Sequence, residues 1–463
     1  MGPQLIALRR SPLPARTTPP VDAEALEKAL RARVSGEVRF TPGDRALYAT
    51  DGSNYRQVPI GVVIPRTLDD VIATVEECKN HGAPLLSRGG GTSLAGQCCN
   101  VAVVIDWSKH LNQILSLDAA ARTAVVQPGC VLDNLRHRAW RQHLTFAPDP
   151  STHEYCTLGG MIGNNSCGVH SILGGRTVDN VESLEILTYD GIRLRVGATP
   201  DDELERLCAT EGRVGQIYRD LVALRDRYAR LIRARYPKIP RRVSGYSLDE
   251  LLPERGFHVA RALVGAEGTC VTVLEATVRL VPWPKCRSLL VLGYPSVYEA
   301  ADHVVEIRES GCMGLEGLDD RLLDDMMKKH IHPKDTKLLP DGKGWLMVEF
   351  GGDDKAEADA KARALMTLLA ARPHAPTMKL FDDESEEHKL WLVRESGLGA
   401  TARVPGQKRD AWEGWEDAAV EPAQLGAYLR EFRALLDRYE YGCSLYGHFG
   451  DGCVHTRIDF DLR

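Results

Sequence analysis

The sequence predicts an α+β fold in two parts, and two observations lead to this prediction. Up to about residue 285, short β-rich pieces alternate with turns and helices, and the stretch Val278–Pro284 contains two prolines that end a strand and stiffen a connection. From Leu289 the pattern restarts as strand, helix, strand, helix, which is typical of an α+β domain with one antiparallel sheet. We expect one domain over residues 21–285 and a second over residues 286–463, after a flexible tail at residues 1–20.

The composition excludes several classes of protein. The chain has 463 residues, of which 43% are hydrophobic and 26% charged, as in an ordinary globular protein of two or three domains. A net charge of −6 gives no reason to expect nucleic acid as a partner, and no apolar run reaches the roughly 18 residues of a membrane span. The 12 cysteines include no Cys-x-x-Cys pair, so neither a zinc ribbon nor an iron–sulfur cradle is expected. Prolines interrupt any secretory signal, which favours a cytoplasmic protein with reduced thiols.

The first domain is expected to open with a helical lead-in over residues 21–48 and then a helix over residues 67–82. Thr67 can cap this second helix, and Gly82 can end it. A strand and a glycine-rich loop follow at once, so the order is helix, strand, loop. Neither a Rossmann fingerprint nor a Walker loop is therefore present. The buried stripe of the helix is expected to contain Val71, Ile72, Val75 and Cys78.

Two glycine-rich loops in this domain indicate one long ligand. The segment Pro84–Gly96 is an apolar strand that ends in Arg88 and three consecutive glycines, followed by Thr92 and Ser93. Glycines without Cβ atoms let backbone N–H groups converge on an anion, and the two hydroxyls add donors, so a diphosphate would fit there. The segment Phe146–Gly168 is a second loop rich in Gly, Asn, Ser and Thr. FAD is the natural candidate for a ligand held by two such loops.

The remaining elements alternate along the chain. Four short strands are expected at Val101–Asp106, Ala124–Gln127, Val181–Thr188 and Arg193–Val196. A helix follows, with apolar residues at steps of four and three, namely Ile217, Leu221, Leu224, Tyr228 and Leu231. The Pro- and Arg-rich residues 236–256 indicate no role by themselves. The second domain is expected to contain the strand Leu289–Gly293, the helix Val297–Ser310, the strand Trp345–Gly351 and the helix Asp354–Ala371.

Two histidines flank a glycine-rich turn near the end of the chain, in Gly447–His455. The glycines permit a reversal that could aim His448 and His455 at one point. Two convergent imidazoles suit zinc or another divalent transition metal. The alternative is a pair of surface or core histidines without a ligand.

Together these motifs resemble the FAD-binding domain shared by vanillyl-alcohol oxidase, p-cresol methylhydroxylase (PCMH) and D-2-hydroxy-acid dehydrogenases. Gly174–Val181 and Gly265–Thr269 add to the resemblance, which runs from about Tyr48 to the last residue. It implies a PCMH-type FAD-binding domain of two α/β subdomains, followed by a substrate or cap domain of the FAD-linked oxidase C-terminal type. We expect non-covalent FAD, because the first glycine loop contains no histidine. The residues that the resemblance assigns to FAD are Pro65, Arg88, Gly89, Gly90, Gly91, Thr92, Ser93, Pro148, Asp149, Ser151, Thr157, Gly159, Gly160, Gly163, Asn164, Ser166, Gly168 and Glu267.

Two further segments resemble the D-2-hydroxyglutarate and D-lactate dehydrogenase branch. Gly447–His455 is similar to its metal-binding segment, which implies that His448 and His455 ligate a metal that binds the substrate's hydroxyl and carboxylate. Trp391-Leu-Val-Arg394-Glu395 is similar to a segment whose arginine binds the substrate carboxylate, which implies this role for Arg394. Arg457 is a second candidate for the substrate. The alternative for Arg394 is a solvated helix face.

This chain also departs from that branch. Arg457 stands where relatives have an asparagine, and their substrate-site lysine is not matched: Trp415 stands nearest, with Lys408 or Arg409 as candidate substitutes. Relatives take a further metal-binding carboxylate from a segment that would lie beyond Arg463. We therefore expect an incomplete metal site, and a sequence that is the FAD half of a longer flavoprotein. A 4Fe–4S cluster is expected only in that further part.

The resemblance implies an FAD-dependent dehydrogenase that oxidises a small D-2-hydroxy acid, of the 2-hydroxyglutarate, lactate or glycolate type, to the 2-oxo acid. The metal would assist, and a hydride would pass to flavin N5. An iron–sulfur domain, a quinone or an electron-transfer flavoprotein would then accept the electrons, in the cytoplasm or at the periphery of the inner membrane. The alternative is a flavin-binding electron-transfer module, or an inactive fragment, that holds FAD without turning over a substrate.

Overall fold

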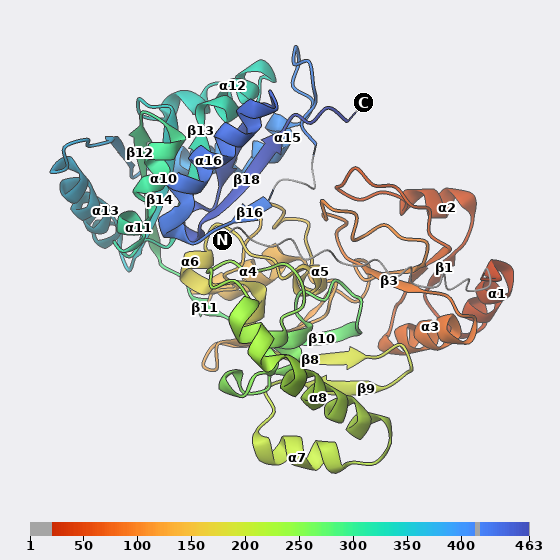
Figure 1. Ribbon diagram of the computed structural model, residues 1–463. Helices are drawn as coiled ribbons and strands as arrows, with labels where there is room; N and C mark the ends of the chain where they lie inside the picture. The colour runs from red at the N-terminus through yellow and green to blue at the C-terminus, as the bar shows by residue number, and fades with distance from the viewer. Residues whose placement is uncertain (1–20, 413–416, 463) are drawn as a thin grey trace, which may run out of the picture.

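The computed structural model describes residues 21–412 and 417–462, so the expected tail at residues 1–20 lies outside the described residues. Figure 1 shows three groups of elements. The helices α1–α3 surround a small sheet on the right, α7 and α8 lie below β8–β10, and the C-terminal domain forms the upper left. These groups correspond to two α/β subdomains and an α+β domain with an antiparallel sheet, so the predicted fold class is confirmed.

The first sheet supports the first glycine-rich loop. Its strands, in spatial order, are β1 (Glu37–Arg39), β2 (Gly61–Ile64), β4 (Val103–Asp106) and β3 (Leu85–Arg88). The strands β2, β4 and β3 are parallel and β1 is antiparallel. Parallel strands need a crossover, and the helix α3 (Leu68–Asn80) provides it between β2 and β3. Thr67 caps α3 in a capping box with Asp70, as the sequence predicted for Thr67.

The expected helical lead-in is only partly helical. It contains α1 (Ala23–Arg33) and α2 (Pro42–Leu47), but β1 lies between them. Val38 is the buried residue of this short edge strand and pairs with Val63 of β2. Three residues are too few for an alternating pattern, so the sequence alone does not reveal the strand.

The second sheet has five antiparallel strands and carries the second α/β subdomain. In spatial order they are β5 (Ile114–Asp118), β6 (Thr123–Val126), β10 (Thr272–Arg279), β8 (Val181–Leu187) and β9 (Arg193–Val196). The long helix α8 (Gly212–Arg235) packs against α7 (Asp201–Ala209). The predicted helix is present, but its apolar stripe is only half-buried and Leu231 is exposed. The other elements are α4 (Leu132–Trp140), β7 (Leu144–Thr145), α5 (Leu158–Asn164), α6 (Ser171–Gly174), α9 (Val259–Leu263) and β11 (Val281–Pro282).

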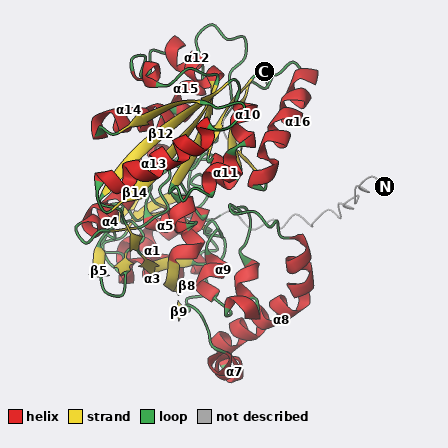
Figure 2. Cartoon of the chain, turned by 90° about the vertical axis from the view of Figure 1, so that its left-hand side faces the viewer, coloured by secondary structure: helices red, strands yellow, loops and turns green. Residues whose placement is uncertain are grey.

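The C-terminal domain is built on a seven-stranded antiparallel sheet. In spatial order its strands are β15 (Thr377–Phe381), β12 (Cys286–Tyr294), β14 (Gly344–Gly352), β13 (Gly314–Asp319), β17 (Cys443–Gly447), β18 (Cys453–Ile458) and β16 (Asp417–Ala419). Successive residues of β12 alternate between two apolar clusters, because side chains of a strand point to opposite faces. Leu290 and Leu292 pack under one set of helices, and Leu289 and Val291 under the other. Figure 2 shows helices on both sides of this sheet.

One face is covered by α10 (Val297–Asp302), α11 (Val304–Arg308), α13 (Lys355–Ala370) and α16 (Leu425–Arg438). The other is covered by α12 (Asp320–Lys328), α14 (Glu384–Glu395) and α15 (Gly397–Thr401). The single helix expected over Val297–Ser310 is therefore two helices that meet at His303.

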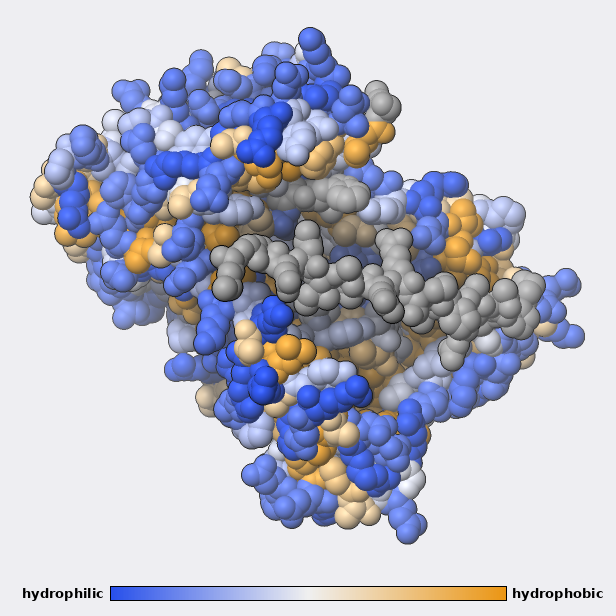
Figure 3. Space-filling model, in the orientation of Figure 1, coloured by the Kyte–Doolittle hydropathy of each residue, from blue (hydrophilic) through white to orange (hydrophobic). Residues whose placement is uncertain are grey.

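The view in Figure 3 shows a mainly hydrophilic surface, with apolar residues scattered over both domains. Within residues 21–412 and 417–462, no helix combines the length and apolar character that a membrane crossing requires.

Candidate active site

One cavity of about 900 Å³ is lined by residues of both domains. The FAD-binding side contributes both glycine-rich loops and the segment from Tyr236 to Tyr246. The C-terminal domain contributes Arg394 from α14, Tyr446 from β17, and the His448 turn with its neighbours on β18. A smaller pocket of about 100 Å³ is lined by residues of both glycine-rich loops and by Glu267. Two loops that are far apart in the sequence therefore face the same cavity as the histidine pair.

The first glycine-rich loop packs directly onto the second. A Cβ atom added to Gly90 would lie 3.0 Å from the carbonyl carbon of Tyr155 and closer still to its oxygen. Gly91 has a φ of +69°, a region that favours glycine. The guanidinium of Arg88 stabilises this loop, because it donates hydrogen bonds to three backbone carbonyls: those of Tyr48 at 3.2 Å, Thr50 at 2.8 Å and Cys98 at 3.1 Å.

Most residues that the sequence assigned to FAD line one of these two cavities. They are Arg88, Gly89, Gly90, Gly91, Thr92, Ser93, Asp149, Ser151, Thr157, Gly159, Gly160, Gly163, Asn164, Ser166 and Glu267. Pro65, Pro148 and Gly168 do not line either of them. Pro65 and Pro148 are buried, and Gly168 packs tightly against the backbone of Asp149.

The two histidines converge as the glycine-rich turn predicted. The Nε2 atoms of His448 and His455 are 3.3 Å apart. The Nδ1 atom of His448 lies 2.8 Å from Oε1 of Glu316, and Nδ1 of His455 lies 2.6 Å from Oδ1 of Asp417. A carboxylate that accepts from Nδ1–H leaves the lone pair on Nε2, so two lone pairs face each other across 3.3 Å.

This arrangement fits a shared cation or proton, because a carboxylate behind each imidazole is the usual support of a metal-binding histidine. Burial, reinforced by the charges of Arg241 and Arg394, pushes the pKa of His448 well below its usual range, so its ring is neutral and can ligate a cation. No cluster of three or more metal-binding side chains occurs among residues 21–412 and 417–462. The two imidazoles therefore make at most a partial site within that part of the chain.

Two buried guanidinium groups face the cavity around one tyrosine. Arg394 Nη2 lies 2.5 Å from Oε2 of Glu316, and its Cζ atom is 5.1 Å from the ring centre of Tyr446. Arg457 donates from Nε to the Tyr446 hydroxyl over 2.8 Å and lies 5.5 Å from the same ring. Burial raises the pKa of the Glu316 carboxyl, although Arg394 and Arg241 act in the opposite direction. Glu316 thus joins the arginine and the histidine of the predicted site.

The proposed substitutes for the missing lysine do not reach the cavity. Arg409 donates to the backbone carbonyl of Glu440 and lies over the ring of Tyr441. Lys408 is likewise absent from the lining residues, and Trp415 lies outside the described residues.

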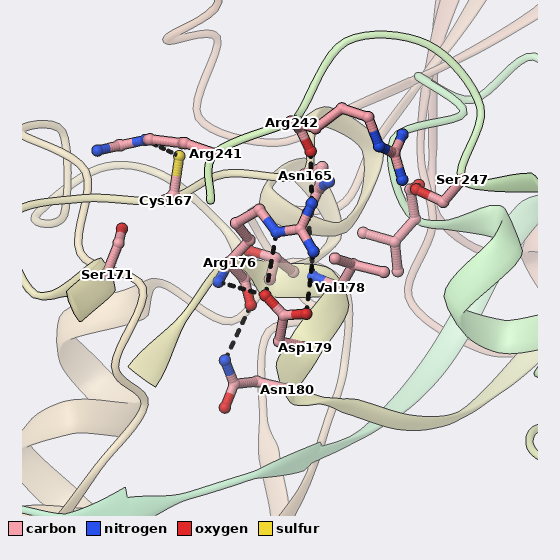
Figure 4. A network of polar contacts seen from close by, with 12 residues as sticks. Asn165, Cys167, Ser171, Arg176, Val178, Asp179, Asn180, Arg241, Arg242 and Ser247 are labelled. Atoms are coloured by element: carbon pink, nitrogen blue, oxygen red, sulfur yellow. Dashed lines mark hydrogen bonds and ion pairs between the residues drawn. The ribbon is translucent and has the colours of Figure 1, made fainter. Parts of the chain in front are cut away.

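A third arginine at the cavity comes from the Pro- and Arg-rich residues 236–256, for which the sequence predicts no role. Arg241 is buried, lines the cavity, and donates from Nε to the Cys167 sulfur over 2.6 Å. Figure 4 shows that Arg241 and Arg242 extend in opposite directions from this segment. Arg242, which also lines the cavity, pairs with Asp249 at 2.5 Å, and its backbone carbonyl accepts from Arg176.

Comparison with known proteins assigns a family to each half of this structure. Residues 59–197 match the FAD binding domain family, and residues 283–463 match the family of FAD linked oxidases, C-terminal domain. The chain belongs to the FAD-linked oxidases. The two family segments contain most residues that line the cavity; the segment around Arg241 and Glu267 lie outside them.

Similar proteins within the FAD-linked oxidases include hydroxy-acid enzymes. The chain is 32% identical to a D-2-hydroxyglutarate dehydrogenase of Pseudomonas putida over 95% of its own length and 45% of the relative's. It is 27% identical to the glycolate oxidase subunit GlcD of Bacillus subtilis, over 93% of this chain and 80% of that one. The chain thus spans less than half the length of the D-2-hydroxyglutarate dehydrogenases that it matches.

Two solved structures share the fold at low identity. An alkyldihydroxyacetonephosphate synthase matches with a TM-score of 0.64 and 17% identity, over 95% of this chain and 81% of that one. A p-cresol methylhydroxylase matches with a TM-score of 0.63 and 13% identity, over 94% and 82% of the two chains. These matches support the two-domain fold.

Three charged residues of the site were not predicted from the sequence. Glu316 lies in the middle of the largely apolar strand β13, which ends at Asp319, and Asp417 is the first residue of the short strand β16. Arg241 belongs to a segment without periodicity. A charged residue within an otherwise apolar strand was the one available signal, and it applies to Glu316 alone.

Proposed function

We propose that the protein is an FAD-dependent dehydrogenase that oxidises a small D-2-hydroxy acid to the corresponding 2-oxo acid. One observation carries the proposal: both glycine-rich loops and the group Arg394, His448, His455 and Arg457 line a single cavity of about 900 Å³. The names of the relatives, D-2-hydroxyglutarate dehydrogenase and glycolate oxidase subunit, support the same class of substrate.

The glycine-rich loops would hold FAD along its length. Backbone N–H groups of the first loop, with the hydroxyls of Thr92 and Ser93, would bind the diphosphate. The second loop, including Ser151, Thr157 and Asn164, lines the adjoining wall of the cavity. FAD, when bound, supplies the acceptor for the two electrons of the α C–H bond. The histidines that line the cavity, His448 and His455, lie in the C-terminal domain, and the first loop contains none, which supports non-covalent binding.

Arg394 and Arg457 would bind the substrate carboxylate. A guanidinium offers two parallel N–H donors to a carboxylate, and burial strengthens such a pair relative to the same pair in water. Glu316 orients Arg394 from the side at 2.5 Å, and Tyr446 lies against both guanidinium groups. The substrate carboxylate would therefore be held in a fixed position relative to the glycine-rich loops.

The histidine pair would receive the 2-hydroxyl group of the substrate. Glu316 fixes Nδ1–H of His448, so Nε2 is the atom that can accept a proton or ligate a cation. His448 and His455 are the residues that would hold a divalent metal, zinc by ligand type, and that metal would lower the pKa of the hydroxyl. Electrons would leave through an acceptor such as an iron–sulfur domain, a quinone or an electron-transfer flavoprotein. The iron–sulfur alternative would belong to a longer protein of which this chain is the FAD half.

Anaerobic mixing of the FAD-loaded protein with D- and L-2-hydroxy acids tests the proposal. We expect D-acids to bleach the flavin absorbance and their L-enantiomers to do so at least about tenfold more slowly. Arg394→Lys should slow the bleaching, because an ammonium group cannot make the bidentate contact. Arg430→Lys is the matched control, since Arg430 is an exposed arginine paired with Asp302. If the protein binds FAD and no D-acid reduces it, the electron-transfer module is the correct alternative.

A further inference from the structure

A buried histidine connects the two domains next to the cavity. His170 follows the second glycine-rich loop, and its Nδ1 atom lies 2.5 Å from Oδ2 of Asp149 in the same loop. Its Nε2 atom lies 2.6 Å from Oε2 of Glu349, which is on β14 of the C-terminal domain. The three residues are 5%, 8% and 0% exposed, respectively. We name these three residues the interdomain tie.

Both nitrogens of the His170 ring act as donors when Asp149 and Glu349 are ionised. Two ionised carboxylates can only accept, and a neutral imidazole has one donor and one acceptor. Contacts of 2.5 and 2.6 Å on both sides are therefore satisfied only by an imidazolium, which brings one positive charge between two negative ones. Burial alone would lower the pKa of His170, but Asp149 and Glu349 raise it to about 10.

The tie leads to the proposed substrate-binding arginine. Oε1 of Glu349 also accepts from the indole N–H of Trp391 on α14 at 3.3 Å. Trp391 lies three residues before Arg394, so the two side chains are neighbours on one side of this helix. On the other side, Asp149 belongs to the loop that lines the cavity. A short chain of contacts thus connects the second glycine-rich loop with the helix that carries Arg394.

We propose that His170 is a positioning residue, a doubly protonated imidazolium that fixes α14, and with it Arg394, relative to the second glycine-rich loop. This inference rests on the proposed function where it concerns the substrate, and on the contacts alone where it concerns α14. The tie holds both partners by strong charge-assisted hydrogen bonds in a dry environment, so loss of one donor leaves a buried carboxylate without its partner.

Other charges near the tie act on the two carboxylates. Arg136 Nη2 lies 3.9 Å from Asp149, and Arg287 Nη1 lies 3.2 Å from Glu349. The carboxyls of Glu395 and Glu387 interact with Asp149 and Glu349, respectively. Burial alone would raise the pKa values of Asp149 and Glu349. The charge of His170 helps to hold both pKa values below their usual range. Both carboxylates are therefore ionised while His170 carries its proton.

Hydrogen exchange of α14 tests the tie without a substrate. In His170→Gln the side chain has no charge and cannot satisfy both carboxylates, so amides of α14 should exchange about tenfold faster than in the wild type. His258→Gln is the matched control, because His258 is also a buried histidine but lies in the α9 region of the FAD-binding domain. Unchanged exchange of α14 in a folded His170→Gln protein would overturn the inference, whatever the protein oxidises.

Steady-state kinetics test the positioning role. His170→Gln should raise the KM for the D-acid about tenfold and change kcat less than about twofold, since carboxylate binding is displaced. His170→Arg keeps a permanent charge with several donors and should retain most of the wild-type affinity. A fall in kcat with an unchanged KM would contradict the role assigned to Arg394 alignment. If no D-acid reduces the flavin, the proposed function fails, and the exchange experiment still decides on the tie.

The pH dependence separates charge from shape. A histidine with a raised pKa is protonated below that value and loses its proton as the pH rises through it. The wild type should therefore lose substrate affinity as the pH passes about 10, and His170→Arg should not. Glu349→Gln, a second variant in case His170 variants do not fold, should move this step to lower pH, because one of the two stabilising charges is gone. A step at the same pH in all three proteins would refute the proposal.

Discussion

Substitution of Gly90 by alanine is expected to weaken FAD binding through the packing of two loops. A Cβ atom on Gly90 would lie 3.0 Å from the carbonyl carbon of Tyr155, whereas ordinary contacts begin at 3.4 Å. This neighbour is a backbone group, so it cannot rotate away, and the loops must separate by at least several tenths of an ångström. Overpacking of this kind costs about 1–3 kcal/mol. If the FAD-bound protein is destabilised by this amount and the free protein is not, the Kd for FAD should rise roughly tenfold to a hundredfold.

Fluorescence titration of the apoprotein with FAD measures this effect directly. Gly43→Ala is the matched control, because a Cβ atom there would have no neighbour nearer than Thr41 Oγ1 at 4.0 Å. Gly163→Ala gives a third comparison: its Cβ would lie 3.8 Å from the Cα atom of Glu267, so only a ligand in the pocket could oppose it. If Gly90→Ala binds FAD as tightly as Gly43→Ala, the two loops do not form the cofactor site.

Three further predictions concern the cofactor, the metal and acid stability. Acid precipitation of the FAD-loaded protein should release all flavin into the supernatant, and flavin retained in the pellet would contradict non-covalent binding. Zinc should bind weakly in calorimetric titrations, because the described site offers two imidazoles where protein zinc sites use three or four ligands. His455→Ala should abolish the binding. Tight stoichiometric binding of zinc would refute the prediction of an incomplete site. Burial and Arg261 lower the pKa of His258 to about 4, so this residue should contribute a loss of up to about 3 kcal/mol of stability between pH 6.5 and 4, as the unfolded chain takes up the proton. Urea unfolding of His258→Gln should show a pH dependence that is smaller by this contribution, and an identical pH dependence would exclude the mechanism.

The parts of the fold that follow from local chemistry were predictable. Thr67 caps α3 through a side-chain bond three residues away, so neighbouring residues alone specify that helix start. The paired histidines were predictable for the same reason, since glycines within the turn bring His448 and His455 together. The short strand β1 was not predictable, because its pairing with β2 depends on a buried Val38 and not on a repeating pattern.

The partners of the candidate site come from distant segments and could not be predicted. Glu316 contacts His448 across 132 positions of the sequence, and Glu349 contacts His170 across 179. A buried carboxylate inside a strand is a sign of a partner, but the sequence does not say which residue that partner is. Gly90 shows a related limit. Its lack of a side chain was interpreted as room for a diphosphate, whereas the contact that a Cβ atom would meet is the backbone of the second loop.

The pairing of β13 with β17 determines when this site can form during folding. Gly317 pairs with Gly447 and Leu318 with Tyr446, and this short ladder joins the four strands from β15 to β13 to the three strands from β17 to β16. A long stretch of chain separates β13 from β17. Bringing the two strands together therefore costs chain entropy before their contacts compensate for it, and such non-local pairings form slowly. We therefore expect the half-sheet that contains β13 to form first, with Glu316 on its open edge. His448 reaches Glu316 only when the last strands dock, so the candidate site is complete only after this late step.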